Sequence, residues 1–301
     1  MDPKLKRLDL RTLALSTSDF LMPRVCLCCG RQLLPAEKHL CCVCLADLPL
    51  THFEGMVHNP MADSFNSLVD APGYERAFAL FYYSGGFERI TQALKYHRNF
   101  GAGSWFGRML AERVLGSGVA FDLVCPVPLH WTRRFTRGYN QAEIIGRAVA
   151  QALGTAFEPG FLRRVRRTGS QVHFSAEDRL RNVSGAFQVT PEALRRWGSP
   201  AGTRPLEGVL TVEGAPVSEV MQTAEGAPVS EVVQTAEGAP VSEGVLTVEG
   251  SSTQVSGRPL QILLIDDVFT TGATLAACAA ALRDALGPDI RISIATLAYA
   301  G

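Results

Sequence analysis

The chain has 301 residues, of which 47% are hydrophobic, and its formal net charge at pH 7 is zero. That size is sufficient to bury a substantial core in one or two domains, and the balanced charge excludes a protein-wide attraction to nucleic acid or membranes. Basic residues near the N-terminus are followed by no long apolar run, so the sequence predicts no signal peptide, no membrane span and a cytoplasmic location. In that compartment we expect the eight cysteines to be thiols or metal ligands and not disulfides.

A dense cysteine cluster follows a short lead-in, residues 1–22, which we predict to be helical. The cluster contains two C-x-x-C pairs separated by eleven residues, namely Cys26 with Cys29 and Cys41 with Cys44. Two such pairs can place four thiolates tetrahedrally around Zn²⁺, and a site filled by four sulfurs is structural because no coordination position stays open. The sequence therefore predicts a small zinc ribbon over residues 23–55, with Cys28 and Cys42 as surplus thiols. A group of redox-sensitive thiols is the alternative.

Strand and helix signals alternate after the cysteines. An apolar run at residues 77–83 predicts a strand, which the Gly85-Gly86 pair ends. Apolar residues at helical spacing then predict two helices, one beginning near Phe87 and one at about residues 103–115. A short strand at residues 123–125 follows and ends at a proline. The pattern is typical of an α/β domain with a mostly parallel sheet and helices on both faces.

A first arginine-rich stretch contains Arg133, Arg134 and Arg137. It lies just before Asn140, which we predict to be the N-cap of an amphipathic helix. Positive charge gathered at a helix start favours an anion, which can also meet the free N–H groups there. A solvated basic loop is the alternative, since runs of charge are usually surface features.

A second arginine-rich stretch, residues 163–171, predicts a mobile basic loop, followed by a short helix around 176–181 and a strand around 186–189. Between residues 131 and 197 the chain has twelve arginines against five acidic residues. A neutral protein with such a segment presents a local surface that attracts anions.

An insert with a twelve-residue tandem repeat occupies residues 199–257. The repeat begins at Thr211 and starts again at residues 223, 235 and 247, and each copy contains proline and glycine. These residues oppose regular structure, so the sequence predicts a disordered surface loop, and so short a unit with little bulk disfavours a solenoid. The insert has eight glutamates and one arginine at residues 201–250, so it could screen the basic surface, although an inert spacer is the simpler reading.

The most informative stretch lies at residues 262–274. Four aliphatic residues, which predict a buried parallel strand, precede the adjacent carboxylates Asp266 and Asp267 where we expect the strand to leave the sheet. The turn that follows opens a helix and consists of Thr270, Thr271, Gly272, Ala273 and Thr274. Helix-start N–H groups and hydroxyls suit a phosphate, and paired acids suit a ribose diol or a hydrated divalent cation. An ordinary capped loop is the alternative, and the absent Gly-Lys-Ser/Thr ending excludes a Walker loop.

This stretch resembles the phosphoribosyl-diphosphate (PRPP) loop of type I phosphoribosyltransferases. The resemblance implies that Asp266 and Asp267 contact the ribose hydroxyls and that residues 270–274 hold the 5′-phosphate, with Mg²⁺ bound alongside PRPP. Purine-salvage members of that family carry an aspartate at the position of Thr270, so the threonine argues against purine salvage.

Further motifs are similar in identity and order to those of the ComF competence-protein family. Besides the cysteine pairs and the Asp-Asp loop, they are Leu94-Lys95-Tyr96, the Pro-Val-Pro-Leu-His segment at 126–130, the Arg-Gly-Tyr-Asn-Gln segment at 137–141, and Arg179 with Asn182. The resemblance covers roughly residues 23–182 and 262–301. It implies a zinc ribbon joined to a phosphoribosyltransferase-like domain at residues 75–198 and 258–301.

The same resemblance suggests where a diphosphate would bind. Residues 128–137 would form the pyrophosphate loop, with Arg133, Arg134, Arg137 and Lys95 as the anion-binding side chains. Residues 163–171 would form the flexible loop that closes over the substrate. These assignments carry less sequence support than the two aspartates.

Two classes of function remain open from the sequence. The first is a ComF-type accessory protein for DNA uptake that binds PRPP or a nucleotide, with single-stranded DNA and a competence helicase as partners. The second is an active phosphoribosyltransferase that transfers phosphoribosyl from PRPP to a nitrogen acceptor. No side chain identifies itself as a general base or marks an acceptor pocket, so the catalytic residues are unknown from the sequence, and the first class is favoured.

Overall fold

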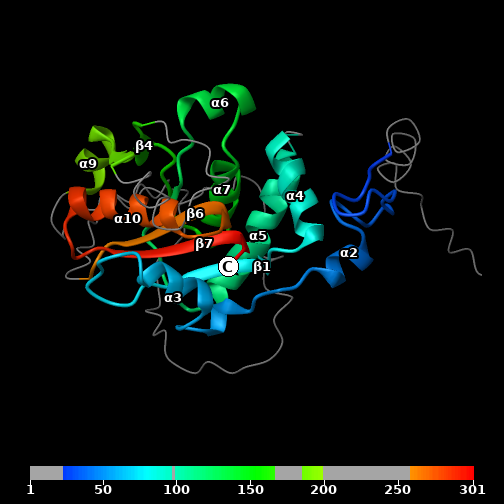
Figure 1. Cartoon of the computed structure of the whole chain (residues 1–301), viewed down its shortest axis with the longest axis horizontal. Coiled ribbons are helices and arrows are strands. Elements are labelled where there is room, and N and C mark those ends of the chain that lie inside the picture. The colour runs from blue at the N-terminus through cyan, green and yellow to red at the C-terminus, as the bar shows by residue number, and fades with distance from the viewer. Residues whose placement is uncertain (1–22, 97–98, 167–184, 199–257) are drawn as a thin grey trace, which may run out of the picture.

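The computed structural model describes residues 23–96, 99–166, 185–198 and 258–301 (Figure 1). The helical lead-in expected at 1–22, the insert at 199–257 and the helix expected around 176–181 lie outside the described residues. Among the helices in the described ranges, none combines the length and the apolar character needed to cross a bilayer.

A five-stranded sheet forms the centre of the fold, and every pair of neighbouring strands in it is parallel. Its order is β1-β7-β6-β2-β3, with β1 at Ala77–Tyr82, β2 at Leu123–Pro126, β3 at Ala156–Phe157, β6 at Gln261–Phe269 and β7 at Arg291–Tyr299. The central strands are buried on both faces, which is why they consist of nearly continuous apolar residues. The predicted parallel α/β sheet is confirmed.

Helices cover both faces of this sheet (Figure 1). They are α3 (Pro60–Asn66), α4 (Gly85–Tyr96), α5 (Phe100–Gly116), α7 (Gln141–Leu153) and α10 (Ala273–Leu286). The side chains of α3 and α10 pack in one core with Ile262 and Leu264, whereas those of α4, α5 and α7 pack in a second core with Leu263 and Ile265. Successive residues of β6 therefore point to opposite sides, as strand geometry requires.

A second, two-stranded antiparallel sheet accompanies the main sheet. In it β4 (Leu162–Arg164) pairs with β5 (Phe187–Val189), and α9 (Pro191–Trp197) follows β5. The predicted strand around 186–189 is confirmed, but the prediction of a loop from residue 163 is wrong for Arg163 and Arg164. Both belong to β4, where Arg163 donates to the Gln188 side chain at 3.1 Å and the Arg164 guanidinium lies over the Phe187 ring.

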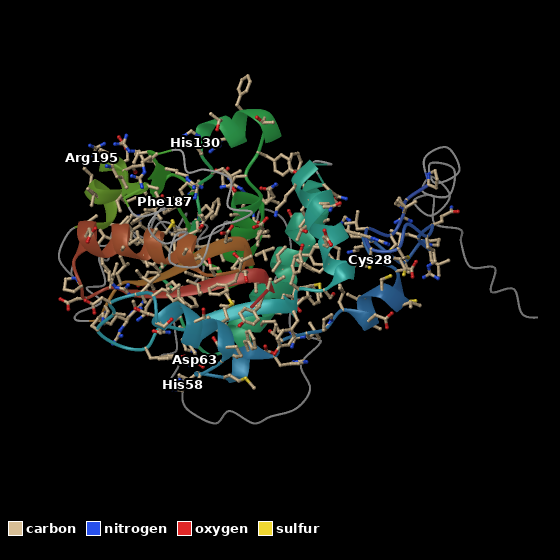
Figure 2. The ribbon with its side chains drawn as sticks, viewed as in Figure 1. Cys28, His58, Asp63, His130, Phe187 and Arg195 are labelled. Carbon is tan, nitrogen blue, oxygen red and sulfur yellow. The ribbon has the colours of Figure 1, made fainter. Side chains whose placement is uncertain are left out.

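The segment expected as the pyrophosphate loop at 128–137 contains a helix, α6 (Trp131–Arg137). The His130 ring accepts a hydrogen bond from the Thr132 amide at its start. At its end Gly138 adopts a φ of 78°, and its amide donates to the Arg134 carbonyl at 2.7 Å. The loop prediction is wrong from residue 131 onward, because a cap at each end stabilises this turn of helix. Figure 2 shows His130 at the base of α6.

A buried ion pair joins the loop before β1 to helix α10. The Glu75 carboxylate, whose side chain is 2% exposed, lies 2.6 Å from the Arg283 guanidinium of α10 and accepts the Ile292 amide of β7 at 3.0 Å. The Glu75 backbone exchanges two hydrogen bonds with the Asn66 side chain of α3. One residue thus links α3, α10 and the start of β7.

The cysteine-rich ribbon packs against the second core. The ribbon contains α2 (Cys42–Asp47), and the short 3-10 helix η1 (Phe53–Gly55) lies between α2 and the sheet in the sequence. Leu33 and Leu40 of the ribbon lie in the same buried cluster as Phe81 and Phe87 of the domain. Residues 49–51 also bond to the outer edge of β1, so the edge strand of the sheet is covered.

Candidate functional sites

The four cysteines predicted as metal ligands come together in the ribbon. The sulfur atoms of Cys26, Cys29, Cys41 and Cys44 all lie within 4.8 Å of one another. The Cys29 and Cys41 sulfurs are 3.9 Å apart, close to the separation of about 3.8 Å that a tetrahedral Zn²⁺ with bonds of about 2.3 Å requires. The donor set and its spacing fit a structural zinc ion.

The electrostatics of this cluster favour a thiolate before any metal binds. The Cys41 amide donates to the Cys26 sulfur at 3.4 Å, and the Cys44 amide donates to the Cys41 sulfur at the same distance. Burial opposes the charged form of Cys26, but backbone N–H groups outweigh burial and lower its pKa to about 6. The surplus thiols differ, since Cys42 is exposed and Cys28 is partly buried against helix α4.

The ribbon contacts the first half of α4. The Cys28 carbonyl accepts a hydrogen bond from the Arg89 guanidinium at 2.9 Å. A Cβ atom placed on Gly86 would lie 3.0 Å from the Cys28 sulfur, a tight contact that a glycine at this position avoids. Figure 2 shows Cys28 on the side of the ribbon that faces α4.

The two acids of the Asp-Asp stretch lie on β6, beyond the end of its pairing with β2. That pairing stops at Ile265, whereas pairing with β7 continues to Phe269, so the strand does not leave the sheet at the acids as expected. By alternation, Asp266 shares the α10 side of the sheet and Asp267 the α4 side. The Asp267 amide donates to the Asp266 carboxylate at 2.8 Å. Each acid can therefore contact a different part of one ligand.

The environment of Asp266 disfavours its charged form. Burial is the largest cause and the neighbouring Asp267 carboxylate is the second, and together they raise the pKa of Asp266 to about 8. The Asp267 amide and the Lys95 ammonium oppose this shift and only reduce it. Strongly perturbed carboxyls cluster at functional sites, and Asp266 also lines a pocket, which makes it a candidate functional residue.

This shift predicts a pH-dependent gain in stability for Asp266→Asn. The pKa is raised from 3.8 in the unfolded chain, so the stability that protonated Asp266 contributes is fully present below about pH 4 and is lost as pH rises through about 8. We expect the variant to be more stable than the wild type by on the order of 1–3 kcal/mol at pH 9, with little difference near pH 4.

Urea unfolding between pH 4 and pH 9 measures this difference. Glu192→Gln removes a carboxyl that is 74% exposed and is the matched control, for which we expect no pH-dependent gain. A constant difference across the pH range for Asp266→Asn would contradict the raised pKa.

The turn after β6 forms an open pocket at the start of α10. Asp266 and residues 268–275 line it. Gly272 precedes the helix with a φ of 74° and gives it no side-chain cap. A Cβ atom on Gly272 would lie 2.7 Å from the Phe269 ring, so both conformation and space require glycine. The first N–H groups of α10 have no intrahelical partner and, with the three threonine hydroxyls of the turn, can receive an anion.

The four basic residues that were predicted to bind the diphosphate differ in their surroundings. Lys95, in the last turn of α4, lies 3.1 Å from the Asp267 carboxylate and so belongs to the acid pair. Arg134 lies 2.8 Å from Glu143 of α7, an intramolecular partner. The side chains of Arg133 and Arg137 lie outside the described part of the structure.

The Gly-Tyr-Asn-Gln segment after α6 has roles that sequence reasoning missed. Asn140 is the predicted N-cap of α7, which is confirmed by its bond from the Ala142 amide, and its side-chain amide also donates to the Val127 carbonyl at 2.9 Å. The Tyr139 hydroxyl and the Gln141 amide both donate to the Leu94 carbonyl of α4. These residues connect the ends of three helices, which spacing along the chain cannot reveal.

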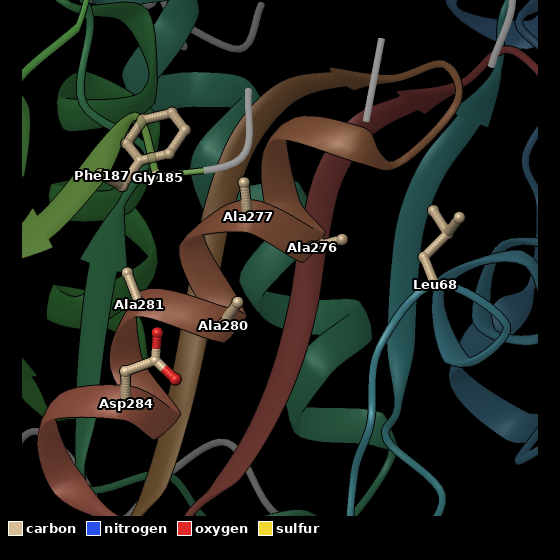
Figure 3. Close-up of a pocket in the computed structure, with 8 residues that line it drawn as sticks. All are labelled: Leu68, Gly185, Phe187, Ala276, Ala277, Ala280, Ala281 and Asp284. Carbon is tan, nitrogen blue, oxygen red and sulfur yellow. The ribbon is translucent and has the colours of Figure 1, made fainter. Parts of the chain in front are cut away.

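A second hollow runs along the outer face of α10 (Figure 3). Alanines at positions 276, 277, 280 and 281 form its floor, between Leu68 on one side and Phe187 on the other. Asp284 is the one charged residue among those that line it, so this hollow does not favour a phosphate. The pocket at the start of α10 is the better candidate for an anionic ligand.

Comparison with known proteins gives relatives whose names concern DNA. No protein-family model matches the chain. It is 26% identical over 185 residues to the DNA utilization protein YhgH of Salmonella typhimurium, covering 56% of this chain and 78% of that protein. It is 24% identical over 173 residues to competence protein F of Haemophilus influenzae, covering 54% and 76%. The YhgH of Escherichia coli K12 is 28% identical over 170 residues, covering 55% and 70%. These similarities support a relationship to the competence-protein family.

Proposed function

We propose that this chain is a ComF-type accessory protein for DNA uptake that binds PRPP or a related nucleotide at the β6–α10 turn. One observation supports the ligand assignment: a pocket lined by Asp266, the first acid of the pair, and by the turn that leads to the glycine-capped start of α10. The names of the relatives carry the assignment to DNA uptake.

In this proposal the phosphate and the ribose of the ligand bind to different groups of the protein. The 5′-phosphate accepts hydrogen bonds from the first N–H groups of α10 and from the hydroxyls of Thr270, Thr271 and Thr274. The ribose diol donates to the carboxylates of Asp266 and Asp267. When Mg²⁺ accompanies PRPP, it neutralises the diphosphate, and the oxygen donors of the acid pair suit its hydration shell.

Exposed features of α6 support a contact with single-stranded DNA. Phe135 is 89% exposed, so it belongs to no core, and it lies in a helix whose sequence carries three arginines. An aromatic ring beside positive charge can stack on a base while the phosphates are neutralised. We expect Phe135→Ala to weaken single-stranded DNA binding by about 1–3 kcal/mol without changing PRPP binding.

Thermal unfolding with PRPP and Mg²⁺ tests the ligand assignment. The wild type should be stabilised by about 2.7 kcal/mol at a ligand concentration near 100 times Kd, and Asp266→Ala with Asp267→Ala should abolish the shift. Asp284→Ala is the control, because it removes a carboxylate from the last turn of α10, where it lines the other hollow. An equal shift in the double variant would contradict the assignment.

Two further measurements on the same preparation separate the classes of function. Release of pyrophosphate from PRPP across a panel of bases and amines would indicate a transferase, in which a C1–N bond forms as the C1–O bond to diphosphate breaks. Salt-sensitive binding of single-stranded DNA without any response to PRPP would favour the basic surface and overturn the pocket.

A further inference from the structure

Lys95 contacts the acid pair from a helix that is distant in sequence. Its ammonium nitrogen lies 3.1 Å from the Asp267 carboxylate, and the two side chains are 28% and 19% exposed. Fully exposed pairs of this kind contribute little, but partial burial strengthens the interaction and reduces its screening by salt. Asp267 is adjacent in sequence to Asp266, which lines the pocket at the start of α10, so the Lys95–Asp267 pair places its charges beside that pocket.

The last turn of α4 is held in place by side chains from the segment that follows α6. The Leu94 carbonyl is among the final four of the helix and so has no intrahelical donor. It accepts hydrogen bonds from the Tyr139 hydroxyl and from the Gln141 amide, the latter at 3.5 Å. The Tyr139 ring also packs edge-on against Phe100, with ring centroids 4.9 Å apart. Tyr139, in the turn between α6 and α7, and Gln141, at the start of α7, thus fix the backbone next to Lys95.

We propose that Lys95 is a built-in cation beside the ribose-phosphate pocket and lowers the requirement of that pocket for a divalent metal ion. The inference rests on the proposed function, because it concerns the same pocket. Two adjacent carboxylates repel each other and repel a phosphate, and a fixed ammonium beside Asp267 offsets that repulsion. The remaining carboxylate lone pairs stay available to the ribose diol.

Ribose 5-phosphate is the appropriate probe, because it lacks the diphosphate that brings its own Mg²⁺. Calorimetric titration in EDTA and in Mg²⁺ should give the wild type similar Kd values, within about threefold. Lys95→Met should weaken binding in EDTA by about tenfold or more, the size expected for loss of a charged partner, and Mg²⁺ should restore part of it. Lys95→Arg keeps the charge and should keep the wild-type pattern.

Two more variants test positioning without touching the charge. Gln141→Leu and Tyr139→Phe each remove one donor to the Leu94 carbonyl, and each should shift the Kd in EDTA in the direction of Lys95→Met, by a smaller factor. Lys38→Met is the matched control, since Lys38 is an exposed lysine of the ribbon. It should leave the dependence on Mg²⁺ unchanged.

The possible failures are distinguishable. If Lys95→Met binds ribose 5-phosphate with the same dependence on Mg²⁺ as the wild type, the role of Lys95 is wrong and the pocket assignment stands. If the wild type binds neither ribose 5-phosphate nor PRPP in either buffer, the proposed function itself is wrong. Should Lys95→Met not fold, a wild-type pattern in Gln141→Leu and Tyr139→Phe overturns the positioning argument.

Discussion

Replacing Cys29 with serine should remove the zinc ion and unfold the ribbon, whereas replacing Cys42 with serine should do neither. Both side chains are exposed in the same ribbon, but only Cys29 belongs to the group of four sulfurs within 4.8 Å. A segment with so few core residues depends on metal binding for its folding free energy. We expect Cys29→Ser to weaken zinc affinity by more than about a hundredfold.

Zinc content per chain and limited trypsin digestion check this expectation. Loss of the ribbon should make the bonds after Arg31 and Lys38 sensitive to trypsin, while the parallel sheet stays protected. The sheet has its own two cores, but Leu33 and Leu40 cover part of one of them, so a lower Tm should accompany the cleavage. Full zinc content in Cys29→Ser would contradict the ligand set.

Replacing Arg283 with methionine should destabilise the fold by about 3–5 kcal/mol. The change leaves the Glu75 carboxylate, at 2% exposure, without its charged partner. Burial already raises the pKa of Glu75, and the arginine counteracts this effect. Without the arginine the penalty grows as pH rises above the ordinary glutamate pKa, so the loss should be smallest near pH 4.

The exposed pair Arg195 and Glu192 is the matched control. Its side chains are 71% and 74% exposed, and Arg195→Met should change the free energy of unfolding by less than about 1 kcal/mol. Adding Glu75→Gln to Arg283→Met should recover part of the loss, because the remaining buried group is then neutral. Equal losses for Arg283→Met and Arg195→Met would show that the buried pair has no special weight.

The elements predicted best were those whose signal is local. The strands at 77–83 and 123–125 and the buried run at 262–265 were recognisable because parallel strands buried on both faces have nearly continuous apolar sequences. The four cysteine ligands were recognisable because the two C-x-x-C pairs have knuckle spacing. Asn140 was predicted as a cap because capping acts within one turn.

One of the misses was local, and the other two depended on contacts between distant segments. Helix α6 was expected as a loop because its N-cap is His130, which is not among the usual capping residues, although Gly138 did mark its end. The end of β6 was placed too early because pairing with β7 continues after pairing with β2 has stopped. Lys95 was grouped with the arginines because no sequence pattern shows that α4 ends beside β6.

Helix α4 has one further consequence for the whole molecule. It is twelve residues long, about 18 Å, with its first half bonded to the ribbon through Cys28 and its last turn beside the acid pair. If the contact with the ribbon is lost, we expect the whole helix to shift, and its last turn, which carries Lys95, to move with it. We therefore expect unfolding of the ribbon to change ligand affinity, and a double-variant cycle between Cys29→Ser and Lys95→Met would measure that coupling.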